Sequence, residues 1–193
     1  MPVSVFNVLL AGVGGQGIVF TSRILLEEAV LRQCPARGAE THGMAQRGGS
    51  VVAHARFGPC HSPLVIPGTG HLLLALEPRE GLRSLPLLRD GGAFLVNTPS
   101  LDFIDQDSSA ELSTYLDDHR IVVLPLDAAK IAAELGNPMA VNLILTGFAA
   151  ALPQTPFTLE GLRSAVLRVA RSHHEAMIAA LEAGHRAGVR EPA

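Results

Sequence analysis

The sequence predicts an α/β protein with three layers (α/β/α), a mostly parallel, mixed sheet, a Rossmann-like first βα unit and a helical C-terminal third. Residues 5–11 form an apolar run that stops at a glycine cluster, as a buried parallel strand does. Further short apolar runs alternate with a helical pattern up to about residue 124, and from residue 127 onward the pattern is helical. We expect a single domain over residues 1–193.

Composition limits the kinds of protein that this can be. The chain has 193 residues, 48% of them hydrophobic, which is enough to bury one large core. The net charge of -3 and the lack of a long Lys/Arg run argue against nucleic-acid binding. Cys34 and Cys60 are the only cysteines and form no CxxC pair, so a disulfide scaffold, a zinc knuckle and an iron-sulfur cluster are not expected.

The N-terminus lacks the basic region of a secretory signal, and its apolar run ends in glycines. The later apolar run, residues 139–152, is too short to span a bilayer. We therefore predict a cytoplasmic protein that does not contact a membrane.

The turn after the first strand has glycines in the GxGxxG spacing. Glycine lets the chain turn tightly and lets a ligand approach the backbone, while the free N–H groups and dipole of the following helix favour an anion such as pyrophosphate. The alternative is a tight strand-helix turn without a ligand. The candidate binding residues here are Gly12, Gly14, Gly15, Gln16 and Gly17.

The helix predicted over residues 16–33 is apolar on two sides. A broad stripe suits packing on a sheet, and Glu28 with Arg32 is expected to form a surface pair. The narrower stripe could be covered by another helix of the same chain or by a partner subunit. The broad stripe contains Ile18, Val19, Ser22, Leu25, Leu26, Ala29 and Val30, and the narrow one Phe20, Ile24 and Leu31.

A dinucleotide-binding fold would next show a second strand that ends in an acid for the ribose. Glu40 stands at a suitable distance, but the residues before it contain no apolar run, so we predict no strand there. This absence argues against NAD binding.

A polar, glycine-rich segment, residues 40–50, leads into a strand predicted over residues 51–57. Its side chains can donate to an anion, and Gly48-Gly49 would let backbone approach closely. We expect this loop to meet the glycine turn at the carboxyl ends of the strands. Its candidate binding residues are His42, Gln46, Arg47 and Ser50.

The remaining elements follow from apolar runs and breakers. Residues 97–118 are acidic and are expected to be solvated, not a metal site. Strands are expected over 71–77, 93–96 and 121–124, and helices over 78–89, 127–135, 139–152, 158–170 and 173–188.

These motifs resemble the gamma-type domain of the 2-oxoacid:ferredoxin oxidoreductases and, among them, the beta subunit of indolepyruvate ferredoxin oxidoreductase. The resemblance rests on residues 7–18, 42–51, 62–64, 74–78 and 137–147 and covers nearly the whole chain. Members of the family often have asparagine where Met177 stands here.

The resemblance implies a subunit of an enzyme that decarboxylates an aryl or branched 2-oxoacid such as indolepyruvate, forms an acyl-CoA and reduces ferredoxin. Thiamine diphosphate, magnesium and the iron-sulfur clusters are expected on a larger partner subunit, because this chain lacks their motifs. We expect no catalytic or metal-binding residue in this chain, which would complete the partner's active-site cleft and present its glycine turn to coenzyme A.

Two rival functions remain open at this point. One is a free-standing nucleotide-binding module, supported by the glycine motif alone. The other is a structural subunit whose glycine turn contacts only protein. When isolated, the chain could also form a homodimer through an uncovered apolar stripe.

Overall fold

The computed structural model describes residues 5–43, 48–98 and 106–190, and side chains from residue 110 onward in the third range. Its described residues form one six-stranded sheet in the order β2-β3-β1-β4-β5-β6. Only β3 runs opposite to the rest, which confirms the predicted mixed, mostly parallel sheet. The strands are β1 (Phe6–Val13), β2 (Ala36–His42), β3 (Ser50–Phe57), β4 (Gly70–Ala75), β5 (Leu88–Asn97) and β6 (Val122–Leu126).

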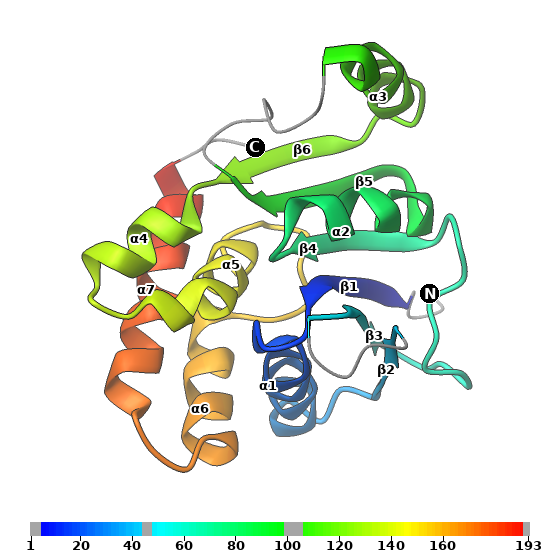
Figure 1. Ribbon diagram of the computed structural model, residues 1–193. Helices are drawn as coiled ribbons and strands as arrows, with labels where there is room; N and C mark the ends of the chain where they lie inside the picture. Colours follow the sequence, from blue (N-terminus) through cyan, green and yellow to red (C-terminus); the bar gives the residue numbers. More distant parts are fainter. Residues whose placement is uncertain (1–4, 44–47, 99–105, 191–193) are drawn as a thin grey trace.

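Helices cover both faces of the sheet, which gives the three predicted layers (Figure 1). One face packs against α1 and the C-terminal helices, and the other against α2 and α3. The α-helices are α1 (Ile18–Leu31), α2 (Pro78–Ser84), α3 (Gln106–Asp118), α4 (Ala128–Glu134), α5 (Val141–Ala149), α6 (Leu159–Val169) and α7 (His174–Arg190), and short 3₁₀ turns are η1 (Leu85–Leu87) and η2 (Pro138–Ala140).

The two faces receive alternate residues of each central strand. In β1, Val8 and Leu10 join the larger core with α1, while Leu9 and Ala11 join the core under α2. The chain leaves β1 toward one face and β4 toward the other. Neighbouring parallel strands with connections on opposite faces create a crevice at their carboxyl ends, where α/β proteins bind ligands.

Helices α5 and α7 pack with their backbones in contact. A Cβ on Gly147 would strike the carbonyl oxygen of Leu181, and a Cβ on Gly184 would strike that of Ile144. Glycine is therefore required on both helices, and the pair forms the C-terminal part of the helical layer.

The predicted absence of a strand around Glu40 is wrong. Residues 36–42 form β2, an edge strand that pairs with β3 and exposes most of its side chains. Such a strand needs no apolar run, because little of it is buried. The antiparallel β3 separates Glu40 from β1, so β2 does not take the place of the ribose-binding strand in a dinucleotide fold.

Two expectations for α1 also need correction. Glu28 is buried instead of exposed, and Val30 of the broad stripe is 62% exposed. Glu28 can be buried because its Oε1 accepts from Arg32 at 3.2 Å and from the Thr158 N–H at 3.4 Å, at the start of α6. In the narrow stripe Ile24 is fully buried, while Phe20 and Leu31 pack partly buried against the chain's own core.

The helix predicted over residues 78–89 ends early, because Pro86 has no N–H for a continued α-helix. The chain makes the 3₁₀ turn η1 instead, and β5 begins at Leu88. Strand β5 then runs through Gly91-Gly92, where its register against β4 shifts. The glycines therefore form an irregularity inside a longer strand instead of preceding a short one.

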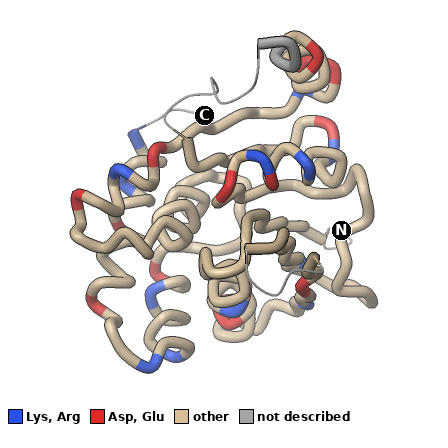
Figure 2. Tube along the Cα trace, in the orientation of Figure 1, with Lys and Arg blue, Asp and Glu red and all other residues tan. Residues whose placement is uncertain are grey.

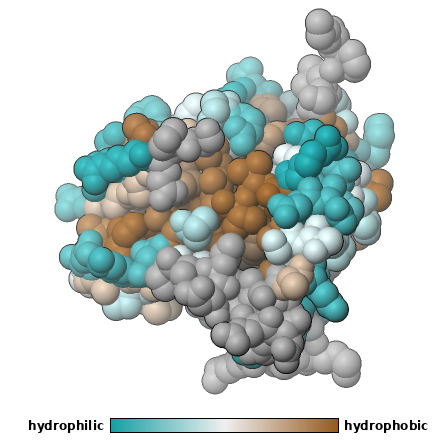
Figure 3. Space-filling view, turned by 90° about the horizontal axis from the view of Figure 1, so that it is seen from above, coloured by the Kyte–Doolittle hydropathy of each residue, from teal (hydrophilic) through white to brown (hydrophobic). Residues whose placement is uncertain are grey.

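Strand β6 forms one edge of the sheet, and Val122 on it is 46% exposed. Figure 3 shows a hydrophobic area on the face seen from this side, bordered by hydrophilic residues. Lys or Arg and Asp or Glu occur together along α1, α2, α6 and α7, whereas α3 has acidic residues and no Lys or Arg (Figure 2). Within the described ranges, every helix is too short or too polar to cross a membrane.

Candidate functional site: the glycine loop and two hollows

The turn from β1 to α1, residues 12–17, is called the glycine loop here. The Gln16 side chain folds back, and its Oε1 accepts the Val13 N–H at 2.9 Å. A Cβ on Gly12 would collide with this Oε1, so Gly12 is needed for the loop's own packing. Gly15 and Gly17 have φ values of 103° and 78°, which other residues rarely adopt.

As expected, the segment between β2 and β3 meets the glycine loop. The Gly14 N–H donates to the Gly49 oxygen at 2.9 Å, and Val13 lies opposite Ser50 in the sheet. This follows from the antiparallel β3, which begins where β1 ends. Gln46 and Arg47 lie outside the described residues, so the predicted position of Arg47 near the helix start is not tested.

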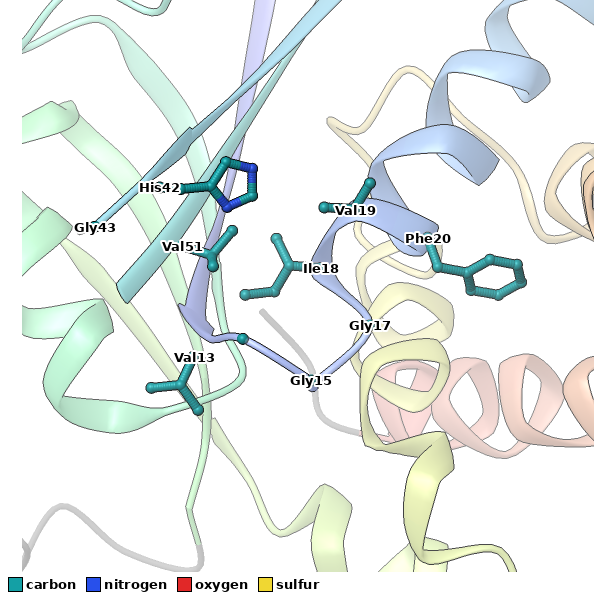
Figure 4. Close-up of a pocket in the computed structure, with 10 residues that line it drawn as sticks. Val13, Gly15, Gly17, Ile18, Val19, Phe20, His42, Gly43 and Val51 are labelled. Atoms are coloured by element: carbon teal, nitrogen blue, oxygen red, sulfur yellow. The ribbon is translucent and has the colours of Figure 1, made fainter. Parts of the chain in front are cut away.

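A hollow of about 630 Å³ lies between the glycine loop and the ends of β2 and β3. We call it the His42 hollow. Figure 4 shows His42 and Val51 on one side of it, facing Ile18 and Val19 of α1, with Phe20 directed away. Of the predicted site residues that the structure describes, Gly14, Gly15, Gly17 and His42 line this hollow, whereas Gly12, Gln16 and Ser50 do not.

The start of α1 has unused hydrogen-bond donors. The N–H groups of Gly15, Gly17 and Ile18 donate to no acceptor among the described residues, and Gly17 provides no side-chain cap. The helix dipole adds positive potential at this point. A ligand with anionic oxygens would find several donors here without displacing a protein group.

A second hollow, of about 560 Å³, lies on the other side of the glycine loop and is called the Asn142 hollow. Asn142 of α5 donates from Nδ2 to the Thr21 Oγ1 at 3.0 Å and to the Gly17 oxygen at 3.4 Å. This hollow was not predicted from the sequence, although a polar residue, Asn142, inside the apolar run 139–152 was a signal for it. Gly15, Gln16, Gly17, Phe20, Met139, Asn142, His173 and Met177 are among its lining residues.

The described residues do not fit the redox groups that the family resemblance implies for a complex. In the described ranges, no three His, Cys, Asp or Glu side chains come together as a metal site. Cys34 and Cys60 are unpaired and half-buried, and two thiols are too few to hold a cluster. No step of the chemistry is therefore assigned to such a group on this chain.

A family model described as pyruvate ferredoxin/flavodoxin oxidoreductase matches residues 7–187. The chain belongs to this family. Its relatives include the indolepyruvate oxidoreductase subunit IorB of Archaeoglobus fulgidus, 33% identical over 86% of both chains. The same subunit of Methanothermobacter thermautotrophicus is 34% identical over 83% of this chain and 86% of its own. The family predicted from the sequence is confirmed, and these relatives are subunits of oxidoreductases, as predicted for this chain.

Solved structures of oxoacid ferredoxin oxidoreductases share the fold. The gamma subunit of a keto/oxoacid ferredoxin oxidoreductase from Geobacter sulfurreducens superposes with a TM-score of 0.73 at 21% identity, over 96% of this chain and 99% of that one. A 2-oxoglutarate:ferredoxin oxidoreductase from Magnetococcus marinus, solved with 2-oxoglutarate, coenzyme A and succinyl-CoA, gives 0.72 at 15% identity. It aligns with 95% of this chain but only 31% of that chain, so the same fold occurs there as part of a longer polypeptide.

Proposed function

We propose that this chain is the subunit without redox centres of an indolepyruvate-type 2-oxoacid:ferredoxin oxidoreductase. A larger subunit carries thiamine diphosphate, magnesium and the iron-sulfur clusters and passes electrons to ferredoxin. This chain completes the cleft of that subunit, and its glycine loop receives the pyrophosphate of coenzyme A. The enzyme works in the cytoplasm.

One observation carries the coenzyme A part of this proposal: the His42 hollow borders a helix start whose N–H groups have no acceptor among the described residues. Pyrophosphate oxygens fit such donors. The imidazole of His42, at the hollow's far side, adds a further hydrogen-bonding group. Coenzyme A is also bound in the Magnetococcus marinus enzyme, whose chain includes this fold.

The sheet argues against a free-standing NAD-binding module. The strand beside β1 on that side is the antiparallel β3, and Glu40 lies one strand further out. The isolated chain should therefore bind no NADH in a fluorescence titration and reduce no ferredoxin. Micromolar affinity for NADH would overturn this reading.

The test uses the chain co-expressed with its larger subunit. Replacing His42 with Ala should raise the apparent KM for coenzyme A several-fold while leaving the KM for indolepyruvate unchanged. The matched control is His61→Ala, another exposed histidine that lies outside the His42 hollow. Arg47→Ala should behave like His42→Ala.

The purely structural role predicts a different result. In that case His42→Ala would reduce the amount of larger subunit that co-purifies, with no selective change in the KM for coenzyme A. Recovery of a full complex with an unchanged coenzyme A KM would also refute a binding role for His42.

A further inference from the structure

The Asn142 hollow adjoins the His42 hollow across the glycine loop. Gly15, Gly17 and Phe20 line both, so a ligand seated on the loop is next to either one. The Asn142 hollow continues from there between α5 and the start of α7. The glycine loop is thus the shared wall of two cavities of similar size.

Asn142 is only 5% exposed, yet its hydrogen bonding is incomplete. The Gly17 oxygen can only accept, so the side chain of Asn142 must turn its Nδ2 toward it. This leaves Oδ1, which accepts from no donor among the described residues, as the polar atom that Asn142 offers to the hollow. An acceptor that faces a hollow without a protein partner favours an N–H or O–H donor as its partner.

The rest of the lining of the Asn142 hollow is mainly apolar, as is that of the His42 hollow. Phe20, Met139, Leu143 and Met177 supply apolar surface, and the lining contains no Lys, Arg, Asp or Glu. Met139 is 75% exposed, so this apolar surface is uncovered in the chain alone. Such a lining suits a neutral, flexible group with apolar segments and a hydrogen-bond donor.

We propose that the Asn142 hollow is a second subsite of the glycine loop, which takes a neutral, amide-bearing chain and pairs one amide N–H with Asn142 Oδ1. The inference rests on the proposed function, in which the pyrophosphate of coenzyme A lies on the loop. The matching group is the pantetheine arm of the same molecule, which has two secondary amides separated by short carbon chains.

The first test fills the hollow without removing a contact. Ala176 is exposed, on α7, and lines the hollow. In the two-subunit enzyme, Ala176→Phe should raise the apparent KM for coenzyme A at least tenfold. The inhibition constant of adenosine 3′-phosphate 5′-diphosphate, which has the pyrophosphate but no arm, should stay unchanged. Ala133→Phe, at an exposed position on α4 outside the hollow, is the matched control.

The second test separates binding by Oδ1 from positioning of the loop. Asn142→Leu removes Oδ1, and loss of one hydrogen bond should raise the coenzyme A KM about fivefold. Thr21→Val removes an acceptor for Nδ2 but keeps Oδ1, and should have a smaller effect. Equal effects of both variants on coenzyme A and on the armless inhibitor would show that Asn142 only positions the loop, and would overturn the subsite.

The outcomes also separate this inference from the function on which it rests. If the armless inhibitor does not compete with coenzyme A in the unmodified enzyme, the glycine loop is not the pyrophosphate site and the proposed function fails. If the inhibitor competes but Ala176→Phe leaves the coenzyme A KM unchanged, only the subsite fails. Release of the larger subunit by Ala176→Phe in gel filtration would mean that protein occupies the hollow, which also overturns the subsite.

Discussion

The two ends of the sheet use their polar groups differently. At the amino end, the side chain of Asn7 donates to Thr69 and accepts from Arg56, whose guanidinium also donates to the backbone oxygens of Ser62 and Leu64. At the carboxyl end, the first N–H groups of α1 and the Asn142 Oδ1 have no partner among the described residues. These polar groups at the amino end are paired within the chain, whereas the N–H groups and the Asn142 Oδ1 at the carboxyl end are left for water or a ligand.

This difference indicates which residues stabilise the fold and which serve a ligand. A polar group that is satisfied within the chain contributes to stability, and its loss leaves a buried partner unpaired. A group without a partner is tolerated beside a hollow, where water or a ligand can reach it. Substitutions at the amino end should therefore change unfolding, and those at the carboxyl end should change binding.

The largest effect on stability is expected at Arg56. Arg56→Ala removes three hydrogen bonds and leaves the Asn7 Oδ1, on a side chain only 4% exposed, without its donor. The free energy of unfolding should fall by about 2–3 kcal/mol, measured by urea denaturation. Arg37→Ala, which removes one exposed bond to the Cys60 oxygen, should cost less, about 1 kcal/mol. A loss for Arg37→Ala equal to that for Arg56→Ala would contradict the comparison.

The next effect is expected at the glycine loop, from Gly17→Ala. A Cβ there would lie 2.5 Å from Asn142 Nδ2, and the φ of 78° adds strain of about 1–2 kcal/mol. Gly15→Ala is the matched control, since Gly15 also has a positive φ but its Cβ would meet nothing within 4 Å. Both variants should lose stability, but Gly17→Ala should weaken coenzyme A binding more. If calorimetry on the complex shows that both variants lose the same coenzyme A affinity, the contact between Gly17 and Asn142 does not contribute to binding.

A pH effect on stability is expected from His54, which lies opposite Leu9 in the middle of the sheet. The ring of His54 is buried and its Nδ1 accepts the Val65 N–H at 3.2 Å, and burial lowers the pKa of His54 from its ordinary 6.5. The unfolded chain then binds a proton at His54 more tightly than the folded chain does. The contribution of His54 to the free energy of unfolding is therefore fully present above pH 6.5 and is lost as the pH falls through the folded-state pKa. His54→Asn should reduce the fall of the free energy of unfolding between pH 7.5 and 5, measured by urea denaturation. Part of this pH dependence should remain in His54→Asn, because burial also lowers the pKa of His71.

The smallest effect is expected from Glu28, at the α1–α6 contact, and has the opposite sign. Burial raises the pKa of Glu28 above 4.5, although its bond to Arg32 opposes the shift. The folded chain holds this proton more tightly, so Glu28 lowers stability as the pH rises above 4.5. Glu28→Gln should remove that decline, while Glu27→Gln, beside Arg168, should leave it in place. If the free energy of unfolding still declines above pH 4.5 in Glu28→Gln, another titratable group causes the decline.

The sequence was sufficient for features that depend on neighbouring residues. Apolar runs such as residues 5–11, glycine spacing and breakers predicted the parallel strands, the glycine loop and the helical C-terminal third. Strand β2 was missed because an exposed edge strand has no apolar signature. The burial of Glu28 could not be seen on a helical wheel, since its partner Thr158 is 130 residues away.

The candidate site was also predictable from the sequence only in part. The meeting of the glycine loop with the segment before β3 was expected from the sequence, but its structural cause was not, because it depends on β3 running antiparallel to β1 and beginning where β1 ends. The Asn142 hollow could not be predicted, because Gly17 and Asn142 are 125 residues apart and only the packing of α5 against α1 brings them together. Local patterns carry no information about such a pair.

The reciprocal glycines of α5 and α7 have a mechanical consequence. Because Gly147 and Gly184 each lie against a carbonyl of the other helix, a larger side chain at either position would have to push α5 and α7 apart. Asn142 is on α5 and Met177 on α7, so such a separation would move two lining residues of the Asn142 hollow away from each other. The glycine loop would be affected as well, because the Gly17 oxygen accepts from Asn142 Nδ2.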